Sequence, residues 1–228
     1  MSWVYEVTLR GAPETAKAAA NWFARGPRST WAELPGLVSL DSYVNAEQQA
    51  HDPYNNDGAG PLLLIVVEFA SREALAAAVG RIVASMGDLP DGVAATGSAL
   101  ERRFYPVGEG TEPAPLEAPL SYVVRYRRPA DDEAAFVDNY LASHPVTQAQ
   151  LPHIRAIMCY LPLDELNHLS VPGADYMIGN EVVFDSVDDL NASMKSPVRE
   201  ELRAHYRAFP RFTGAVTHFP MRRVRHVG

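Results

Sequence analysis

The chain has 228 residues, 47% of them hydrophobic and 21% charged, which suits one large globular domain or two of about 100 residues each. A formal net charge of −8 argues against a nucleic-acid binder, which needs a basic face, and the short basic tail Arg222, Arg223 and Arg225 is expected to be solvated. The single cysteine, Cys159, excludes an internal disulfide and a cysteine-based zinc cluster. With no signal-peptide pattern and no apolar run of about 18 residues, a cytoplasmic protein without membrane contact is expected.

The first half of the chain predicts the element order β-α-β-β-α-β. Alternating aromatic and β-branched residues predict a strand at 3–9, and the alanine-rich stretch 14–25 predicts a helix that Gly26 and Pro27 end. The further elements are a strand at 37–44, a polar loop at 45–61, an apolar strand at 62–69, a helix at 71–86 and a strand at 99–107.

The second half predicts the same order. A helix at 130–143 opens with acidic residues, which the helix dipole favours at that end. The other elements are strands at 120–127, 153–161, 176–184 and 212–221, a loop at 162–175, and helical material at 186–208 interrupted at Pro197. A proline- and glycine-rich linker at 108–119 separates the halves, so two repeats are expected at 1–110 and 118–228.

Two short stretches identify the halves as copies of one unit. NWFARGP at 21–27 corresponds to NYLASHP at 139–145, and each is followed by a Leu-Pro pair. Each unit should form a four-stranded antiparallel sheet with both helices on one face. The bare sheet faces are too apolar for water, so the fold class predicted is α+β, with two ferredoxin-like repeats forming an intramolecular, pseudo-dimeric α+β barrel. A small ligand is expected inside the barrel or beside it, and further pairing into a homodimer stays open.

The second half resembles the EthD-like family of the dimeric α+β barrel superfamily. The resemblance is carried by VVRYRRP (123–129), AAFVDNYLASHPV (134–146), LPHI (151–154) and GNEVVFDSVDDL (179–190). Tyr140, His144 and Glu181 stand at the family's aromatic, histidine and glutamate positions, whereas Gly26 and Val66 stand at the last two in the first half. The resemblance implies the fold; relatives with this barrel include cyclases, isomerases, lyases, monooxygenases, haem enzymes and proteins without known activity.

His144 and Glu181 are the candidate catalytic residues, each with a structural alternative. His144 is expected to act as a general acid or base at the cavity, or else to be a helix-terminal histidine that binds the last carbonyls. Strand alternation turns Glu181 away from Phe184 and into the barrel, as it does Glu68. Such a carboxylate is either catalytic, with a raised pKa, or paired across the barrel with Arg125 or Arg155.

The remaining candidates are expected to line or cover the pocket. His153 is expected to begin a strand on the same face as Arg155, and Tyr140 to shape the pocket. The two long loops supply His51, His168, Tyr54, Asn55 and Asn56 as ligand-orienting or merely solvated residues. His144, His153 and His168 lack the spacing of a metal site, and none is expected. Cys159 is expected to be a buried, inert thiol on the helix-covered face.

The leading hypothesis is an enzyme without a cofactor that acts on a small cyclic or aromatic metabolite by proton transfer, as a lyase, isomerase or cyclase. His144 would be the acid or base, and Tyr140, Arg155 and Glu181 would shape the pocket of the second repeat. The alternatives are a small-molecule-binding or stress-response protein without chemistry, and a haem-binding barrel.

Overall fold

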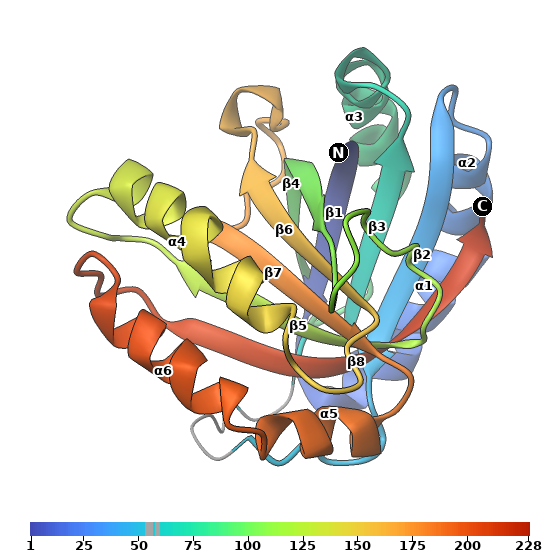
Figure 1. Cartoon of the computed structure of the whole chain (residues 1–228). Coiled ribbons are helices and arrows are strands. Elements are labelled where there is room, and N and C mark those ends of the chain that lie inside the picture. The colour runs from blue at the N-terminus through green and yellow to red at the C-terminus, as the bar shows by residue number, and fades with distance from the viewer. Residues whose placement is uncertain (53–56, 58–59) are drawn as a thin grey trace.

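The computed structural model describes residues 1–52, 57 and 60–228, so Tyr54, Asn55 and Asn56 lie outside the described residues. Eight antiparallel strands close into a barrel in the order β1-β3-β2-β8-β5-β7-β6-β4 (Figure 1). The strands are β1 (Ser2–Arg10), β2 (Leu37–Asn45), β3 (Leu63–Phe69), β4 (Ala94–Tyr105), β5 (Leu120–Arg127), β6 (Ala156–Pro162), β7 (Tyr176–Phe184) and β8 (Val216–Val227).

The barrel consists of two ferredoxin-like units joined along two seams. The first unit has the strand order β4-β1-β3-β2 and the second has the equivalent order β8-β5-β7-β6. The seams are the antiparallel pairs β2–β8 and β4–β6, so none of the strands that the structure describes has a free edge. The predicted fold class is therefore confirmed.

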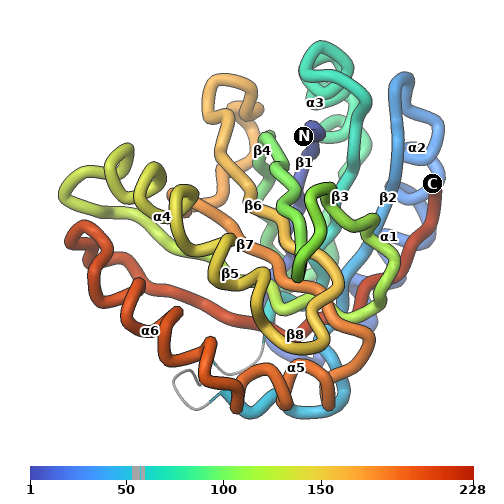
Figure 2. Tube along the Cα trace, in the orientation of Figure 1, coloured from blue at the N-terminus to red at the C-terminus, as the bar shows by residue number. Residues whose placement is uncertain are grey.

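The helices of the two units cover opposite sides of the barrel (Figure 2). They are α1 (Ala16–Arg25), α2 (Pro27–Ala32) and α3 (Arg72–Met86) in the first unit, and α4 (Glu133–Gln148), α5 (Val187–Met194) and α6 (Val198–Ala208) in the second, with short 3₁₀ turns η1 (Pro13–Thr15) and η2 (Asp164–Leu166). Each helical layer packs on its own sheet in a separate apolar cluster, and a third cluster fills the barrel. The repeated serines Ser71 and Ser186 both cap a helix, accepting hydrogen bonds from the backbone N–H of Ala74 and Asp189.

The segment that joins the units closes one end of the barrel. Leu116 and Ala118 are buried in the apolar cluster inside the barrel. Their carbonyl oxygens accept hydrogen bonds from Arg223 Nη2 at 3.0 and 3.2 Å, and Arg223 also forms an ion pair with buried Asp41. The prediction of a solvated basic terminus is therefore wrong for Arg223 and Arg225, which both bind Asp41, because β8 continues through this segment; Arg222 is exposed.

Three local predictions are corrected by backbone structure. The first helix ends at Arg25 as predicted, but Pro27 then begins a further helix, because proline fits the first turn where no N–H partner is needed. Helix α4 continues through Pro145 to Gln148, with Ala149 N–H donating to the carbonyl of Pro145. His153 has φ 62°, so it lies in a turn before β6 and does not begin the strand.

Among the described residues, no helix is both long and apolar enough to cross a membrane.

Candidate functional site

A narrow cavity lies in the second unit between the outer face of its sheet and helices α4 and α6. It contains about 650 Å³ not occupied by protein atoms, open solvent at its mouth included, but only about 60 Å³ admits the centre of a water molecule. Such a slot suits a flat ring better than a bulky group. Its wall is formed by Tyr122, Val124, Tyr126, Tyr140, His144, Gln148, Leu151, Asn180, Val182, Met194, Arg199, Leu202, Arg203, Tyr206, Val216 and His218.

His144 is the buried imidazole of this cavity. Helix α4 places it one turn after Tyr140, whose ring centroid is 4.6 Å from that of His144, and Phe209 lies 5.5 Å away on another side. The residue is 5% exposed, and its Nδ1 has no hydrogen-bond partner among the described residues. The expected alternative, a helix-terminal histidine bound to the last carbonyls, therefore lacks support at Nδ1.

Burial first, and then the electrostatic influence of His205, Arg199 and His218, lowers the pKa of His144 to about 3. The imidazole is therefore neutral at neutral pH and is available as a hydrogen-bond acceptor or proton acceptor. Of the two expected roles, general acid and general base, a neutral imidazole favours the base.

The stability of the protein should fall on mild acidification because of this histidine. In the unfolded chain His144 has its ordinary pKa of 6.5, whereas in the folded chain its pKa is about 3. Protons therefore bind the unfolded chain first, and the free energy of unfolding decreases as the pH falls through 6.5. Between pH 7 and 5 the loss from His144 alone is expected to be about 2 kcal/mol. The measurement is urea unfolding at about pH 7 and about pH 5. The stability lost between these pH values should be smaller in His144→Gln than in the wild type. It should be unchanged in His168→Gln, whose imidazole lies in the loop before β7. An equal acid loss in all three proteins would contradict the assignment.

Two carboxylates behind the wall hold its polar side chains in place. Asp52 Oδ2 accepts hydrogen bonds from the Tyr122 hydroxyl at 2.8 Å and from Arg199 Nη2 at 2.6 Å. Asp57 lies 2.9 Å from His218 Nδ1, and the hydrogen bond from His218, more than any other contact, holds the pKa of Asp57 below its usual range. These acids orient Arg199 and His218 without themselves forming the cavity wall.

The wall combines basic side chains with aromatic rings. Among the described lining residues, Arg199, Arg203, His144 and His218 are basic and none is acidic. Four tyrosines, Tyr122, Tyr126, Tyr140 and Tyr206, supply ring surface. At the sheet face, Gln148 and Asn180 exchange amide hydrogen bonds of 2.8 and 3.0 Å. The arrangement can hold an aromatic molecule with an anionic or acidic oxygen.

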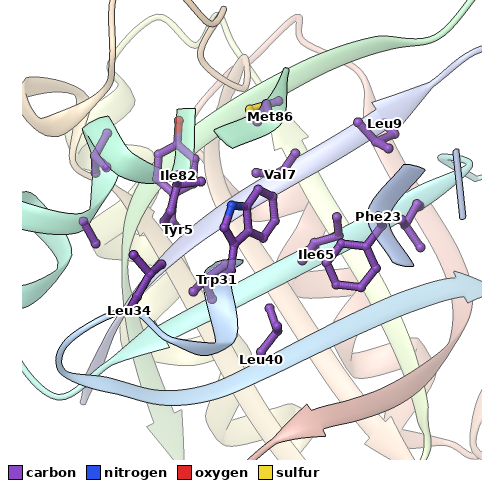
Figure 3. Packing of buried hydrophobic residues seen from close by; sticks show 14 of the residues in the cluster. Tyr5, Val7, Leu9, Phe23, Trp31, Leu34, Leu40, Ile65, Ile82 and Met86 are labelled. Atoms are coloured by element: carbon purple, nitrogen blue, oxygen red, sulfur yellow. The ribbon is translucent and has the colours of Figure 1, made fainter. Parts of the chain in front are cut away.

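The corresponding space in the first unit is filled. Trp31 of α2 lies between the helices and the sheet, close to Phe23, with its Nε1 donating to Ser85 Oγ at 2.7 Å (Figure 3). Trp31 is 0% exposed and packs in the same cluster as Tyr5 and Leu40. The Gly26 and His144 positions of the repeat thus belong to a packed layer in one unit and a hollow layer in the other.

The structure separates Glu181 from His144. Asn180 and Val182 line the His144 cavity, and Glu181 between them points to the opposite face, inside the barrel. There Ser121 Oγ donates to Glu181 at 2.5 Å and the Tyr160 hydroxyl donates to its other oxygen. The two candidates therefore do not act on one ligand from this arrangement.

The predicted cation partners of Glu181 are wrong. Arg125 is inside the barrel but binds Glu6 at 2.5 Å, and Arg155 is an exposed residue whose guanidinium lies 3.7 Å from Asp185. Glu68 does point inward as predicted, where it binds Arg102 at 2.5 Å and accepts a hydrogen bond from Ser39 at 2.6 Å. Glu68 is thus bound by neighbours on β2 and β4, and Glu181 by neighbours on β5 and β6.

The other histidines that the sequence suggested, His51, His153 and His168, are not among the residues of the cavity wall. His153 is half exposed with its Nδ1 3.5 Å from Asp189, His51 is exposed, and His168 contacts Ser170 in the loop before β7. Among the described residues, no three His, Cys, Asp or Glu side chains are grouped as a metal site. Cys159 lies on the helix-covered face as predicted, and burial raises the pKa of its thiol to about 12.

Sequence reasoning missed Arg199, Arg203, His218 and Asp52. The arginines are four residues apart on either side of Leu202, a spacing that places them on one helix face. His218 is two residues after Val216 in the last strand, so both side chains lie on the same face, which the helices cover. These patterns were present, but only the fold shows that the two faces meet around His144.

No model of a known protein family matches the sequence, and no curated protein matches it either. Solved structures match over the full length: an anthrone oxidase-like protein has a TM-score of 0.59 at 13% identity, over 98% of this chain and 91% of the other. A monooxygenase-like protein from Lactobacillus acidophilus has a TM-score of 0.53 at 10% identity, over 99% and 94% of the chains. An EthD family protein from Bacillus halodurans aligns with 43% of this chain and 96% of its own, with a TM-score of 0.35 at 15% identity. The two full-length matches and the strand order show that the chain has the dimeric α+β barrel fold, completed within one polypeptide.

Proposed function

We propose that the protein is an enzyme that binds a small aromatic or cyclic metabolite in the His144 cavity and removes a proton from it. The observation that carries this proposal is a neutral, 5% exposed imidazole with an unpartnered Nδ1, in a slot lined by tyrosines and basic groups. The reaction class is that of a cofactor-independent lyase, isomerase or cyclase.

The chemistry follows from the charges around the slot. A neutral imidazole accepts the proton of a phenolic hydroxyl, or of a carbon next to a carbonyl, and the proton remains on a ring nitrogen of His144. The resulting oxyanion is stabilised by the basic groups Arg199, Arg203 and His218. An anion in the slot also raises the affinity of His144 for the proton, which offsets the effect of burial.

Two features of relatives support the ligand class. Tyr140 and His144 stand where the EthD-like pattern has its aromatic and histidine, and both are in the cavity wall. A full-length structural neighbour is named an anthrone oxidase-like protein, and an anthrone is a fused-ring aromatic ketone. That compound class has the flat shape and the acidic C–H that the slot suits.

The His144 cavity is too small for haem. A porphyrin is a macrocycle of four pyrrole rings, whereas the slot offers room for the centres of a few water molecules only.

The test combines binding with product detection. Thermal unfolding is measured with a panel of phenols, aromatic acids and cyclic ketones, and compounds that stabilise the protein are incubated with it and analysed by mass spectrometry and by deuterium exchange from solvent. Exchange or product formed by the wild type should fall at least ~100-fold in His144→Gln, the loss typical of a missing general base. His168→Gln is the matched control and should keep full activity.

The outcomes separate the hypotheses. Stabilisation that depends on His144 without any exchange or product would identify a binding protein and overturn the catalytic assignment. Unchanged turnover in His144→Gln would remove His144 from the mechanism.

A further inference from the structure

A second cavity lies at the mouth of the barrel, at the end opposite the linker. Strands β1, β2, β5 and β6 run in one direction, so their last residues meet at this end. The cavity has about 270 Å³ accessible to the centres of water molecules, more than four times that of the His144 slot. Because Leu116 and Ala118 fill the far end of the barrel, the cavity is blind.

Two equivalent arginines line this mouth from opposite strands. Trp3 pairs with Phe69, and Leu120 pairs with the equivalent Phe184, so the registers of β1 and β5 match. Arg10 lies seven residues after Trp3, and Arg127 lies seven residues after Leu120, so the two arginines are at equivalent positions. In the closed barrel of eight strands, β1 and β5 lie on opposite sides. The internal pseudo-twofold symmetry brings both guanidinium groups to one cavity.

The floor of the cavity is already neutral. Arg125 Nη2 binds Glu6 at 2.5 Å, and the Tyr176 hydroxyl donates to the other oxygen of Glu6 at 3.2 Å. By contrast, neither Arg10 nor Arg127 forms an ion pair with an acidic side chain among the described residues, although the exposed Asp175 lies on the same wall. Partial burial, and then Arg127 and Arg125, lower the pKa of Arg10, with Glu6 opposing them.

The remaining wall has two kinds of surface. Thr8 and Thr96, which pair across β1 and β4, also line the cavity, and their hydroxyls are further potential donors. Leu64, Val123 and Phe219 provide apolar surface continuous with the core of the barrel. A ligand that satisfies both has an anionic head and a short apolar body.

We infer that the barrel mouth is a second small-molecule site, separate from the His144 cavity, which binds a carboxylate or phosphate between Arg10 and Arg127 and its apolar tail against Leu64, Val123 and Phe219. Paired guanidinium groups bind either head group by bidentate hydrogen bonds. The tail gains free energy by leaving water.

The experiment uses simple amphiphiles as probes. Isothermal titration of the full chain with hexanoate and with hexyl phosphate, at constant ionic strength, should give saturable binding by at least one, and the tighter probe identifies the head group. Acetate and hexanol, which lack the tail and the charge respectively, should each bind at least about tenfold more weakly.

Charge-matched variants locate the site. Arg10→Gln and Arg127→Gln should each weaken binding at least about tenfold, whereas Arg81→Gln, a change on the exposed face of α3, should leave it unchanged. Both arginine variants should unfold at the wild-type temperature or slightly above, since each removes a like-charge contact. Absence of saturable binding by either probe, equal binding of hexanol and hexanoate, or full binding in both variants would overturn the inference. His144→Gln should bind these probes normally, so the two cavities are tested independently.

Discussion

Arg102→Met is expected to lower the free energy of unfolding by about 3–5 kcal/mol, because it leaves a carboxylate uncompensated inside the barrel. Arg102 is 1% exposed, and its Nη2 lies 2.5 Å from Glu68 while its Nε donates to Ser2 Oγ at 3.1 Å. The guanidinium also lies 4.8 Å from the ring centroid of Phe104. Urea unfolding at neutral pH measures the loss.

Two further variants separate charge from packing in this pair. In Arg102→Met combined with Glu68→Met, no charge is stranded, so the double variant should be more stable than Arg102→Met alone. Arg72→Met, which breaks the exposed pair with Glu165, should cost less than about 1 kcal/mol. A loss from Arg102→Met no greater than that of Arg72→Met would show that the buried pair is not the stabilising element described.

Phe136→Ala should cost about 3–5 kcal/mol, the range for removing a buried ring from a core that does not collapse around it. Phe136 is 0% exposed, and its ring centroid lies 5.6 Å from that of Tyr126, 5.2 Å from Phe209 and 5.0 Å from Phe212. These contacts fasten α4, which carries His144, to β5 and to the segment after α6. The measurement is again urea unfolding.

Controls for Phe136 lie at the same site and on the same helix. Phe136→Leu keeps most of the buried volume and should cost less than about 1.5 kcal/mol. Val146→Ala, at a position that is 60% exposed, should change stability by no more than about 0.5 kcal/mol. If Phe136→Ala unfolded at the same urea concentration as Val146→Ala, the aromatic cluster would not be the anchor of α4.

The fold was predictable because both halves of the sequence show the same order of predicted strands and helices. Strand alternation placed Glu68 and Glu181 inside the barrel and Cys159 outside it, and the structure confirms all three. Local signals failed where tertiary contacts decide. The sequence of Arg222, Arg223 and Arg225 looks like a solvated tail, and only the seam with β2 and the buried Asp41 make it a strand.

The candidate site was predictable only in part, since it is made from elements far apart in the chain. His144 and Tyr140 stand in a recognisable pattern, and both line the slot. Asp52, Arg199 and His218 come from a loop, a helix and the last strand, and no pattern in one segment shows that they meet. The partners of Glu181 were mispredicted because Ser121 and Tyr160 carry no charge that would suggest them.

Both seams of the barrel, β2–β8 and β4–β6, are formed within a single molecule. In a barrel assembled from two identical subunits, every substitution occurs twice, so a tryptophan that fills one helical layer fills both. In a single chain one copy can change alone, so Trp31 can fill one helical layer while His144 lines a cavity in the other. Closure of the barrel is also a first-order process, because both halves belong to one chain.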